Sequence, residues 1–326
     1  MRQGNYTADE LKATLAGGLI PAMPVMFDRE ARFQERAHEK YVAFMSSQPI
    51  AGAAVWAHTG RGLLLDDETA RVVMQQWRQG LAGNPLIAGV GARSKDSNPP
   101  QATNATLSMA SAAAEYGADA LLVYPPSWLR DHEQRDSLII KHHERVAELG
   151  LPLVLFYLYE AAGGVCYTTE VLDELLALPN VIGIKMATLD SVMTYQDVAR
   201  HLQAKHPDKL LITGEDRFLG YSLCRGAQAA LIGMAAVCTD LQAELIGTHF
   251  HFRAERFLEL SDLVDQLAEG LFVHPMEGYI GRILFALAKL GVIPIEAAND
   301  PWGPALTAHD FENITNVLNA LNVQVG

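Results

Sequence analysis

The feature of this sequence that most constrains its fold is a regular alternation of short apolar runs with longer stretches of helical periodicity. Such alternation is typical of βαβ units that build a parallel sheet. The apolar runs span residues 19–26, 52–57, 86–91, 120–124, 153–159, 181–185, 210–213 and 229–233. Eight repeats predict a closed (β/α)8 TIM barrel. A doubly wound open sheet is the alternative, but Pro21-Ala22-Met23-Pro24 stands where such a sheet usually has a glycine-rich phosphate turn.

The chain beyond residue 238 shows no further strand pattern and contains helical stretches at 254–271 and 279–290. We therefore expect residues 1–238 to form the barrel core with an N-terminal helix. Residues 239–326 are expected to form the last barrel helix and a helical C-terminal extension. The N-terminal helix carries its own start signal, because Thr7 and Glu10 have the spacing of a capping box.

The composition restricts the class of protein. At 49% hydrophobic and 19% charged residues, the chain of 326 residues is too apolar to be disordered and can bury a large core. Its formal net charge of -13 argues against a nucleic-acid partner, because phosphate binding requires clustered lysine and arginine. The sequence lacks a signal-peptide layout and an apolar run of roughly 18 residues, so no membrane partner is expected. The three widely spaced cysteines, Cys166, Cys224 and Cys238, are predicted to be reduced core thiols of a cytoplasmic protein.

A lysine stands at the end of the sixth apolar run, in Val181-Ile182-Gly183-Ile184-Lys185. A lysine snorkelling out at a strand end is the ordinary interpretation of such a residue. Burial, however, favours the neutral amine, and a neutral amine is a nucleophile that forms a Schiff base with a carbonyl substrate. Because the active sites of TIM barrels lie at the carboxyl ends of the strands, Lys185 is a candidate catalytic residue.

Other polar residues close neighbouring runs. The fifth run ends in Tyr157-Leu158-Tyr159, where strand alternation predicts that both tyrosines share one face. The second run leads into Trp56-Ala57-His58-Thr59-Gly60-Arg61-Gly62, a turn whose amides could bind a carboxylate. A catalytic metal is not expected, because the close histidine pairs His142-His143 and His249-x-His251 do not share one helix face.

The order of these segments resembles the dihydrodipicolinate synthase/N-acetylneuraminate lyase family over most of the chain. The resemblance rests on the strand-2 Thr-Gly turn, the strand-5 tyrosine, Gly183-Ile184-Lys185, Thr213-Gly214-Glu215-Asp216 and a Gly-Ala turn into strand 8. It implies a class I aldolase-like barrel in which Lys185 forms a Schiff base with pyruvate or another small 2-oxo acid, without a cofactor. Members are commonly oligomers, so a homodimer or homotetramer is expected.

The resemblance also assigns roles to individual residues. Tyr157 is the better match to the family's tyrosine that shuttles protons around the imine, and Tyr159 is the second choice. The turn that contains His58, Thr59, Gly60 and Arg61 aligns with the family's carboxylate-binding turn, so Thr59 and Gly60 are expected to hold the substrate carboxylate. Gly214 and Leu231 are expected to line the pocket.

The departures from the family pattern concern substrate choice. His58 replaces a hydroxyl residue of the proton relay and is a candidate general acid or base. Arg61 replaces a glutamate and is a candidate ligand for a distal carboxylate; Arg93, Arg130 and Arg217 also follow strand ends and are weaker candidates.

The choice of reaction is affected by a missing arginine. Members that form dihydrodipicolinate bind the aldehyde carboxylate with an arginine that is absent from Glu160-Ala161-Ala162-Gly163-Gly164, which argues against that reaction. Aldol cleavage or condensation of pyruvate with an aldehyde, dehydration of a 2-keto-3-deoxy sugar acid, and non-catalytic binding of a 2-oxo or sugar acid remain open.

Overall fold

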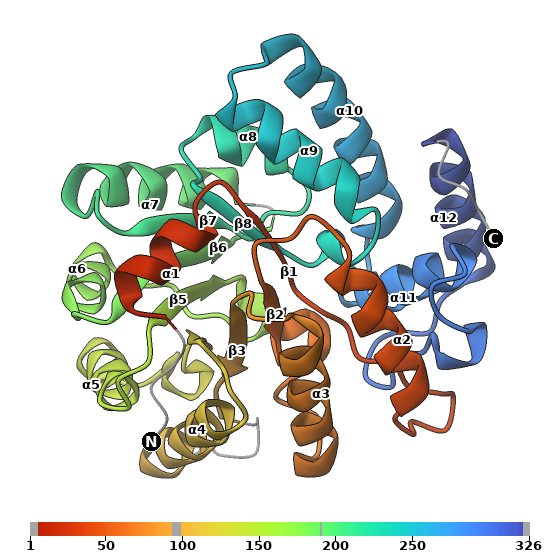
Figure 1. The fold of residues 1–326 in the computed structure, drawn as a ribbon. Coiled ribbons are helices and arrows are strands. Elements are labelled where there is room, and N and C mark those ends of the chain that lie inside the picture. The colour runs from red at the N-terminus through yellow and green to blue at the C-terminus, as the bar shows by residue number, and fades with distance from the viewer. Residues whose placement is uncertain (1–5, 93–98, 190, 322–326) are drawn as a thin grey trace.

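In the computed structural model, which describes residues 6–92, 99–189 and 191–321, eight parallel strands form a barrel (Figure 1). The strands are β1 (Leu19–Pro21), β2 (Ala53–Val55), β3 (Leu86–Val90), β4 (Ala120–Val123), β5 (Leu153–Leu158), β6 (Val181–Ala187), β7 (Leu210–Thr213) and β8 (Ala229–Ile232). Their order is β1-β8-β7-β6-β5-β4-β3-β2, and a parallel bridge between Ala22 and Ala54 joins the two ends of the sheet. The predicted (β/α)8 fold is confirmed.

Helices surround the barrel (Figure 1). Those that follow the strands are α2 (Glu35–Ser46), α3 (Asp67–Gly80), α4 (Pro99–Glu115), α5 (Arg135–Ala147), α6 (Thr169–Ala177), α7 (Val192–Lys205), α8 (Leu219–Cys224) and α9 (Thr239–Phe250). Short 3-10 helices lie after four strands: η1 (His58–Gly60), η2 (Ser127–Leu129), η3 (Glu160–Ala162) and η4 (Met234–Ala236). The N-terminal helix α1 (Ala8–Leu15) begins with the predicted capping box of Thr7 and Glu10. It covers one end of the barrel, because Leu11 and Leu15 belong to the apolar cluster inside it.

Strand alternation divides the core into an inner cluster within the barrel and an outer cluster beneath the helices. On β5, Phe156 and Leu158 belong to the inner cluster, whereas Leu155 and Tyr157 belong to the outer one. The pairing of β5 with β6 contains an irregularity, since Leu153 pairs with Val181 but the next residue, Val154, pairs with Gly183. After this bulge Lys185 pairs with Phe156 and shares its inward direction.

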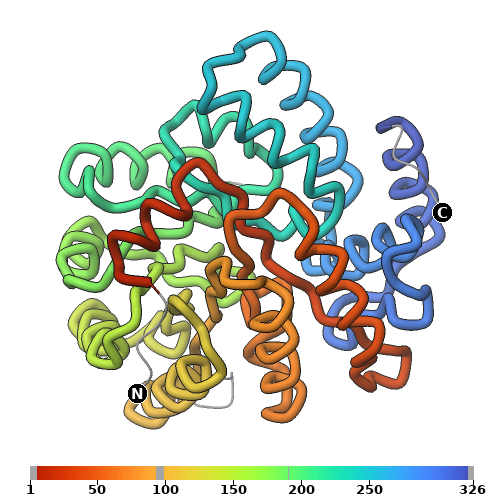
Figure 2. Tube along the Cα trace, viewed as in Figure 1, coloured from red at the N-terminus to blue at the C-terminus, as the bar shows by residue number. Residues whose placement is uncertain are grey.

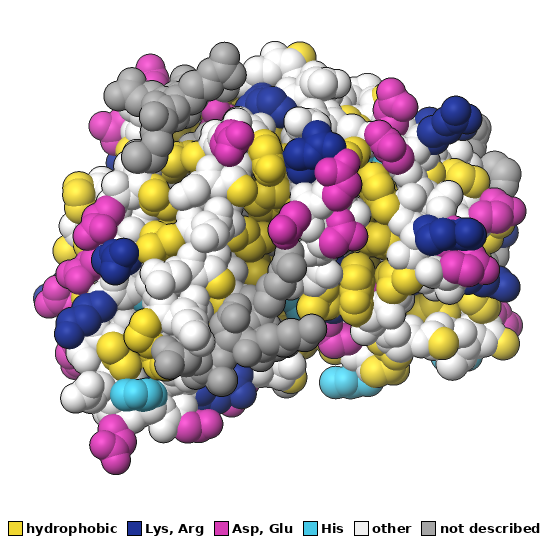
Figure 3. Space-filling view, turned by 90° about the horizontal axis from the view of Figure 1, so that it is seen from below, with side chains coloured by type: hydrophobic (Ala, Val, Ile, Leu, Met, Phe, Trp, Pro, Cys, Tyr) yellow, Lys and Arg dark blue, Asp and Glu magenta, His cyan; other side chains and the backbone are white. Residues whose placement is uncertain are grey.

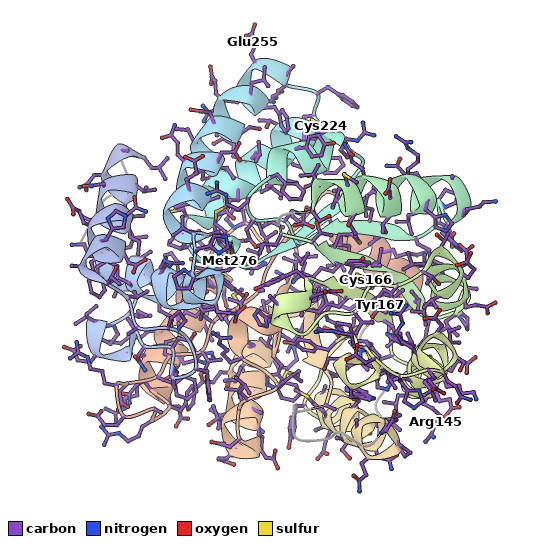
Figure 4. All side chains as sticks on the ribbon, turned by 180° about the vertical axis from the view of Figure 1, so that it is seen from behind. Arg145, Cys166, Tyr167, Cys224, Glu255 and Met276 are labelled. Atoms are coloured by element: carbon purple, nitrogen blue, oxygen red, sulfur yellow. The ribbon has the colours of Figure 1, made fainter. Side chains whose placement is uncertain are left out.

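The C-terminal extension contains α10 (Ala254–Leu271), η5 (Met276–Gly278), α11 (Tyr279–Lys289), η6 (Ile295–Ala297) and α12 (Ala308–Ala320). Figure 2 shows its blue trace gathered at one side of the barrel. A backbone bridge between Phe27 and Asn299 joins it to the segment after β1, and Asn299 Nδ2 donates to the Asp28 carbonyl at 3.0 Å. Seen from behind, Met276 of η5 lies near the middle of the molecule (Figure 4), where it lines the same pocket as Lys185.

Acidic and basic side chains are interspersed on the face that Figure 3 shows. Within the described parts of the chain, none of the helices combines the length and the apolar character that crossing a bilayer requires. All three cysteines are free thiols. The prediction that they lie in the core is wrong for Cys166 and Cys224, which are exposed, because small apolar neighbours in sequence do not fix which side of an element faces the core.

Candidate active site

Lys185 lies at the carboxyl end of β6 and is 5% exposed. Its Nζ atom lies 4.4 Å from the centroid of the Phe156 ring, so an aromatic face occupies space where water would otherwise solvate the ammonium. Burial lowers the pKa of Lys185 to about 8, and the negative charges of Asp216 and Glu215 oppose this shift. The side chain therefore carries a substantial fraction of neutral amine close to neutral pH.

A narrow pocket opens above this amine. It is lined by His58, Thr59, Phe156, Leu158, Tyr159, Lys185, Ala187, Leu189, Gly214, Asp216, Gly233, Phe272, Met276 and Tyr279. Gly214 is needed for the lysine to fit, because a Cβ atom at this position would lie 2.6 Å from Lys185 Cε. Gly214 lines the same pocket as Lys185, and its role toward a substrate stays a prediction. Leu231 is different: it is fully buried in the inner core, and Gly233, two residues later, lines the pocket in its place.

Two acids after β7 have different surroundings. Asp216 lines the pocket, and its Oδ1 accepts a hydrogen bond from the amide of Met234 at 2.7 Å. Glu215 instead accepts from the Thr188 amide at 2.6 Å and the Leu189 amide at 3.0 Å, which holds the segment after β6. Burial raises the pKa of each carboxyl to about 7. Asp216 is thus the acid available to a ligand, and Glu215 supports the backbone.

The turn after β2 forms η1 and brings Thr59 into the pocket. Thr59 Oγ1 and Tyr279 OH form a hydrogen bond of 3.0 Å. The Gly60 amide already donates to the Ala57 carbonyl at 2.9 Å within the turn. Gly60 therefore shapes the turn, and its amide is not free to hold a substrate carboxylate as the sequence suggested. Its lack of a Cβ atom is required, since such an atom would lie 2.6 Å from the Met23 carbonyl oxygen.

Glu277 of η5 reaches over the mouth of the barrel and connects three side chains. Its Oε1 accepts a hydrogen bond from Tyr159 OH at 2.6 Å and lies 3.0 Å from His58 Nε2. Its Oε2 accepts from Arg61 Nη1 at 2.7 Å. Burial alone would raise the pKa of Glu277, but the hydrogen bonds and charges of His58, Tyr159 and Arg61 outweigh it and lower that pKa well below its usual range.

Arg61 does not present a free guanidinium to the site. Its Nη1 contacts Glu277, and its Nη2 donates to Asp300 Oδ2 at 2.7 Å. Arg61 is 9% exposed and Asp300 is 4% exposed, so both charges are removed from water and matched to each other. The expectation that Arg61 binds a distal carboxylate is wrong for this arrangement, because two protein carboxylates already occupy its donors.

The other arginines named from the sequence are Arg130, Arg217 and Arg93. Arg130 donates to the backbone carbonyls of Glu160 and Gly164. Arg217 lies 4.0 Å from Glu269, at the edge of ion-pair distance. Arg93 lies outside the described residues. Arg130 thus braces the segment after β5, and neither it nor Arg217 lines the pocket above Lys185.

The structure reverses the order of the two candidate tyrosines. Tyr157 belongs to the outer core, where its ring packs 5.8 Å from that of Tyr167, beneath the helices. Tyr159 follows the last residue of β5 and lines the pocket with Lys185. Strand alternation applies to Tyr157 but not to Tyr159, because the chain leaves the sheet after Leu158. Of these two tyrosines, Tyr159 is therefore the one that lines the pocket with Lys185.

A cluster of possible metal ligands, which the histidine pairs in the sequence did not indicate, lies between α6 and α7. It consists of Asp173, His201 and His206. Both histidine Nε2 atoms contact the same Asp173 oxygen, at 2.6 and 2.7 Å. Ligands bound at about 2.0–2.2 Å around a tetrahedral zinc ion would be farther apart than this. The observed contacts are those of a carboxylate that accepts two histidine hydrogen bonds.

Taken together, the mouth of the barrel holds a desolvated amine, two phenols, a threonine hydroxyl and an imidazole. The amine of Lys185 supplies a nucleophile, and Thr59, Tyr159 and Tyr279 line the same small pocket. His58 lines both this pocket and a wider cavity beside it, which also contacts Tyr124, Pro125 and Trp128. These groups are those that carbonyl addition and proton transfer require.

Comparison with known proteins gives consistent matches along the chain. A family model described as the dihydrodipicolinate synthetase family matches residues 15–320. A 4-hydroxy-tetrahydrodipicolinate synthase of Bartonella tribocorum is 25% identical over 84% of this chain and 88% of the relative. An N-acetylneuraminate lyase of Citrobacter koseri is 27% identical over 66% of this chain and 67% of the relative. The structure of a Ruminococcus gnavus sialic acid aldolase has a TM-score of 0.79 at 19% identity and covers 95% of this chain and 97% of its own.

Proposed function

We propose, because this chain belongs to the dihydrodipicolinate synthetase family, that Lys185 is the residue through which it forms an imine with a 2-oxo acid. Members of the family are lyases of the class I aldolase type, and the chain is such a lyase. The observation that carries the assignment of Lys185 is its position: it is buried at the end of β6, inside the pocket, with a pKa lowered to about 8.

The chemistry begins with the neutral Lys185 amine. Its nitrogen attacks the ketone carbon of the 2-oxo acid, and a proton moves from nitrogen to the former ketone oxygen to give a carbinolamine. This hydroxyl then leaves as water after it gains one proton, and the nitrogen lone pair forms the C=N bond of a protonated imine. The imine withdraws electrons from the adjacent carbon, so that a C–C bond can break or the C3 proton can leave.

Tyr159 and Thr59 supply the remaining functions in this proposal. Tyr159 is placed to give a proton to the leaving hydroxyl, because its phenol lies in the pocket and burial raises its pKa above the usual range, which keeps it protonated. Thr59 is placed to donate to the substrate carboxylate, with its hydroxyl held by Tyr279. His58 acts as a general acid or base at the edge of the pocket.

The proposed reaction is aldol cleavage or condensation involving pyruvate and an aldehyde. Dehydration of a 2-keto-3-deoxy sugar acid through the same imine is a second candidate, which Asp216 favours, because a carboxyl at the pocket wall can hydrogen-bond to substrate hydroxyl groups. Synthesis of dihydrodipicolinate is not proposed, since the pocket above Lys185 has no arginine among its described lining residues.

Exchange of the pyruvate C3 protons tests the proposal without knowledge of the aldehyde. In D2O, an imine that loses a C3 proton and regains a deuteron replaces CH3 by CD3, which proton NMR follows directly. Wild-type protein should catalyse the exchange, and Lys185→Ala should abolish it while its circular dichroism is unchanged. A protein that only binds 2-oxo acids would bind pyruvate without exchange.

We also propose a cytoplasmic homo-oligomer. We propose an oligomer because members of the family that the chain resembles are commonly oligomers. We propose a cytoplasmic location because the three cysteines are free thiols. A related dihydrodipicolinate synthase variant is described as monomeric, so assembly differs among related proteins. Light scattering of the purified protein tests the assembly, where a mass close to the 35.6 kDa chain would contradict it.

A further inference from the structure

The C-terminal extension contributes a charged side chain to the barrel mouth. Glu277 lies in η5 and follows Met276, which is labelled near the middle of Figure 4. Tyr159 and His58 are connected through Glu277. We infer that Glu277 is a positioning residue that joins His58 to Tyr159 and so completes a proton path from the wider cavity to the Lys185 imine. The inference rests on the proposed function and concerns how that site obtains its protons.

The two oxygens of Glu277 share His58 and differ in their other partner. Oε2 accepts from Arg61 Nη1 at 2.7 Å and lies 3.1 Å from His58 Nε2, and Arg61 is in turn fixed by Asp300. Oε1 lies 3.0 Å from His58 Nε2 and accepts from Tyr159 OH at 2.6 Å. Because Oε1 contacts both the imidazole and the phenol, this carboxylate connects the two groups through a single atom.

The connection through Glu277 allows Tyr159 to give up a proton without becoming a phenolate beside a carboxylate. Burial, followed by its hydrogen bond and charge interaction with Glu277, raises the pKa of Tyr159 above the usual range. A phenol that simply lost its proton would leave a phenolate beside a carboxylate, which is unfavourable. The proton must therefore be replaced as it leaves. As Tyr159 gives its proton to the carbinolamine hydroxyl, which departs as water, Glu277 Oε1 passes a proton to the phenol and takes one from His58 in the same step, so Glu277 is never left protonated.

His58 can regain a proton from solvent. It lines the narrow pocket and also the wider cavity beside it, and its side chain is 18% exposed. The titratable groups around it are Glu277, Tyr159 and Tyr279, with Arg61 and Asp300 behind Glu277. Formation of the protonated imine consumes one solvent proton, which enters through His58, and hydrolysis of the imine releases it again.

The test uses pyruvate and three variants of the full chain: Glu277→Gln, Glu277→Ala and Asp310→Asn. The control residue, Asp310, belongs to the same extension but pairs with Arg282 at 2.7 Å, away from the pocket. For Glu277→Gln, we expect the kcat of C3 exchange to fall by about 10²-fold, typical of lost acid–base assistance, with a nearly unchanged KM. The alkaline limb of the pH profile should disappear in this variant, because the proton path from the wider cavity is broken. Asp310→Asn should keep the wild-type kcat and both limbs.

Formate supplies a second, independent readout. Added to Glu277→Ala, it places a carboxylate in the vacated space and should restore part of the exchange rate, whereas it should not accelerate the wild type. Borohydride trapping of pyruvate on Lys185 should still succeed in Glu277→Gln, which separates this inference from the proposed function. A wild-type rate of exchange in Glu277→Gln would overturn the inference. Equal losses in Glu277→Gln and Asp310→Asn, with an unchanged pH profile and no rescue by formate, would also overturn it. Failure to trap pyruvate even in the wild type would instead overturn the proposed function.

Discussion

The ring of Phe156 lies beneath the amine of Lys185, with 4.4 Å between the ring centroid and Nζ, and the two residues are paired neighbours on β5 and β6. The face of the ring attracts the ammonium weakly, but it cannot solvate it as water does. Burial therefore dominates and lowers the pKa of Lys185 to about 8. The register between β5 and β6 therefore helps to set the pKa of Lys185, because it brings the Phe156 ring beneath the amine.

The first prediction concerns the pH dependence of imine formation. Because only the neutral amine attacks the ketone, and its fraction rises with pH, the rate of adduct formation should increase through a midpoint near the pKa of Lys185, about 8, and level off above it. The rate of borohydride-trapped pyruvate adduct, measured from pH 6 to 10 by intact mass, gives this midpoint. A rate that is still rising steeply at pH 10, as expected for the ordinary lysine pKa of about 10.4, would show that the amine is solvated.

The second prediction separates the two tyrosines. Tyr159→Phe should reduce pyruvate C3 exchange by about 10²-fold, because it removes a phenol from the pocket but keeps the ring. Tyr157→Phe is the matched control, since its ring packs against Tyr167 outside the barrel, and it should leave exchange close to the wild-type rate. The opposite ranking of the two variants would restore Tyr157 as the proton donor.

The third prediction concerns Gly214. In Gly214→Ala the new methyl group would lie 2.6 Å from Lys185 Cε and 2.7 Å from the Met186 carbonyl oxygen. The backbone oxygen cannot easily yield, so we expect a loss of about 1–3 kcal/mol of stability and slower adduct formation from a displaced lysine. Gly247→Ala is the control, because nothing lies within 4 Å of its added Cβ. Urea unfolding and trapping rates measure the two effects, and equal behaviour of both variants would contradict the close approach.

The fourth prediction concerns the buried pair of Arg61 and Asp300. Arg61→Met removes the partner of a carboxylate that is only 4% exposed, and we expect a loss of about 3–5 kcal/mol in the free energy of unfolding. Arg71→Met removes a more exposed pair with Glu68, for which a loss of at most about 1 kcal/mol is expected. Urea denaturation of both variants provides the comparison; an Arg61→Met protein as stable as Arg71→Met would show that solvent reaches Asp300.

Much of the barrel was predictable from the sequence, because each strand is a short apolar run and the fold brings the residues that follow the runs to one end of the barrel. Lys185, Thr59 and Gly214 were named as candidates in this way, and all three line one pocket. Periodicity also located α10 and α11; α10 buries one apolar face, whereas α11 is buried around most of its circumference. These features depend on local pattern alone.

The remaining features depend on where regular structure stops and on contacts between distant segments. The choice between Tyr157 and Tyr159 could not be made from alternation, because Tyr159 lies just after the end of β5. Arg61 meets Asp300 across 239 positions of sequence, and no local pattern indicates that its charge is already matched. The Asp173 cluster is likewise assembled by the packing of two helices.

The measurement that tests the account most directly is trapping of the imine. The protein is incubated with pyruvate and borohydride, and the reduced adduct is mapped by peptide mass spectrometry in wild type, Lys185→Met and Lys209→Met. Lys209 is the control, because it is a partly buried lysine whose pKa is also lowered by burial, but it lies outside the pocket with Nζ bound to the Val181 carbonyl. The account predicts one adduct, on Lys185, that persists in Lys209→Met and vanishes in Lys185→Met. An adduct on another lysine, or none on wild-type protein with intact secondary structure, would contradict it.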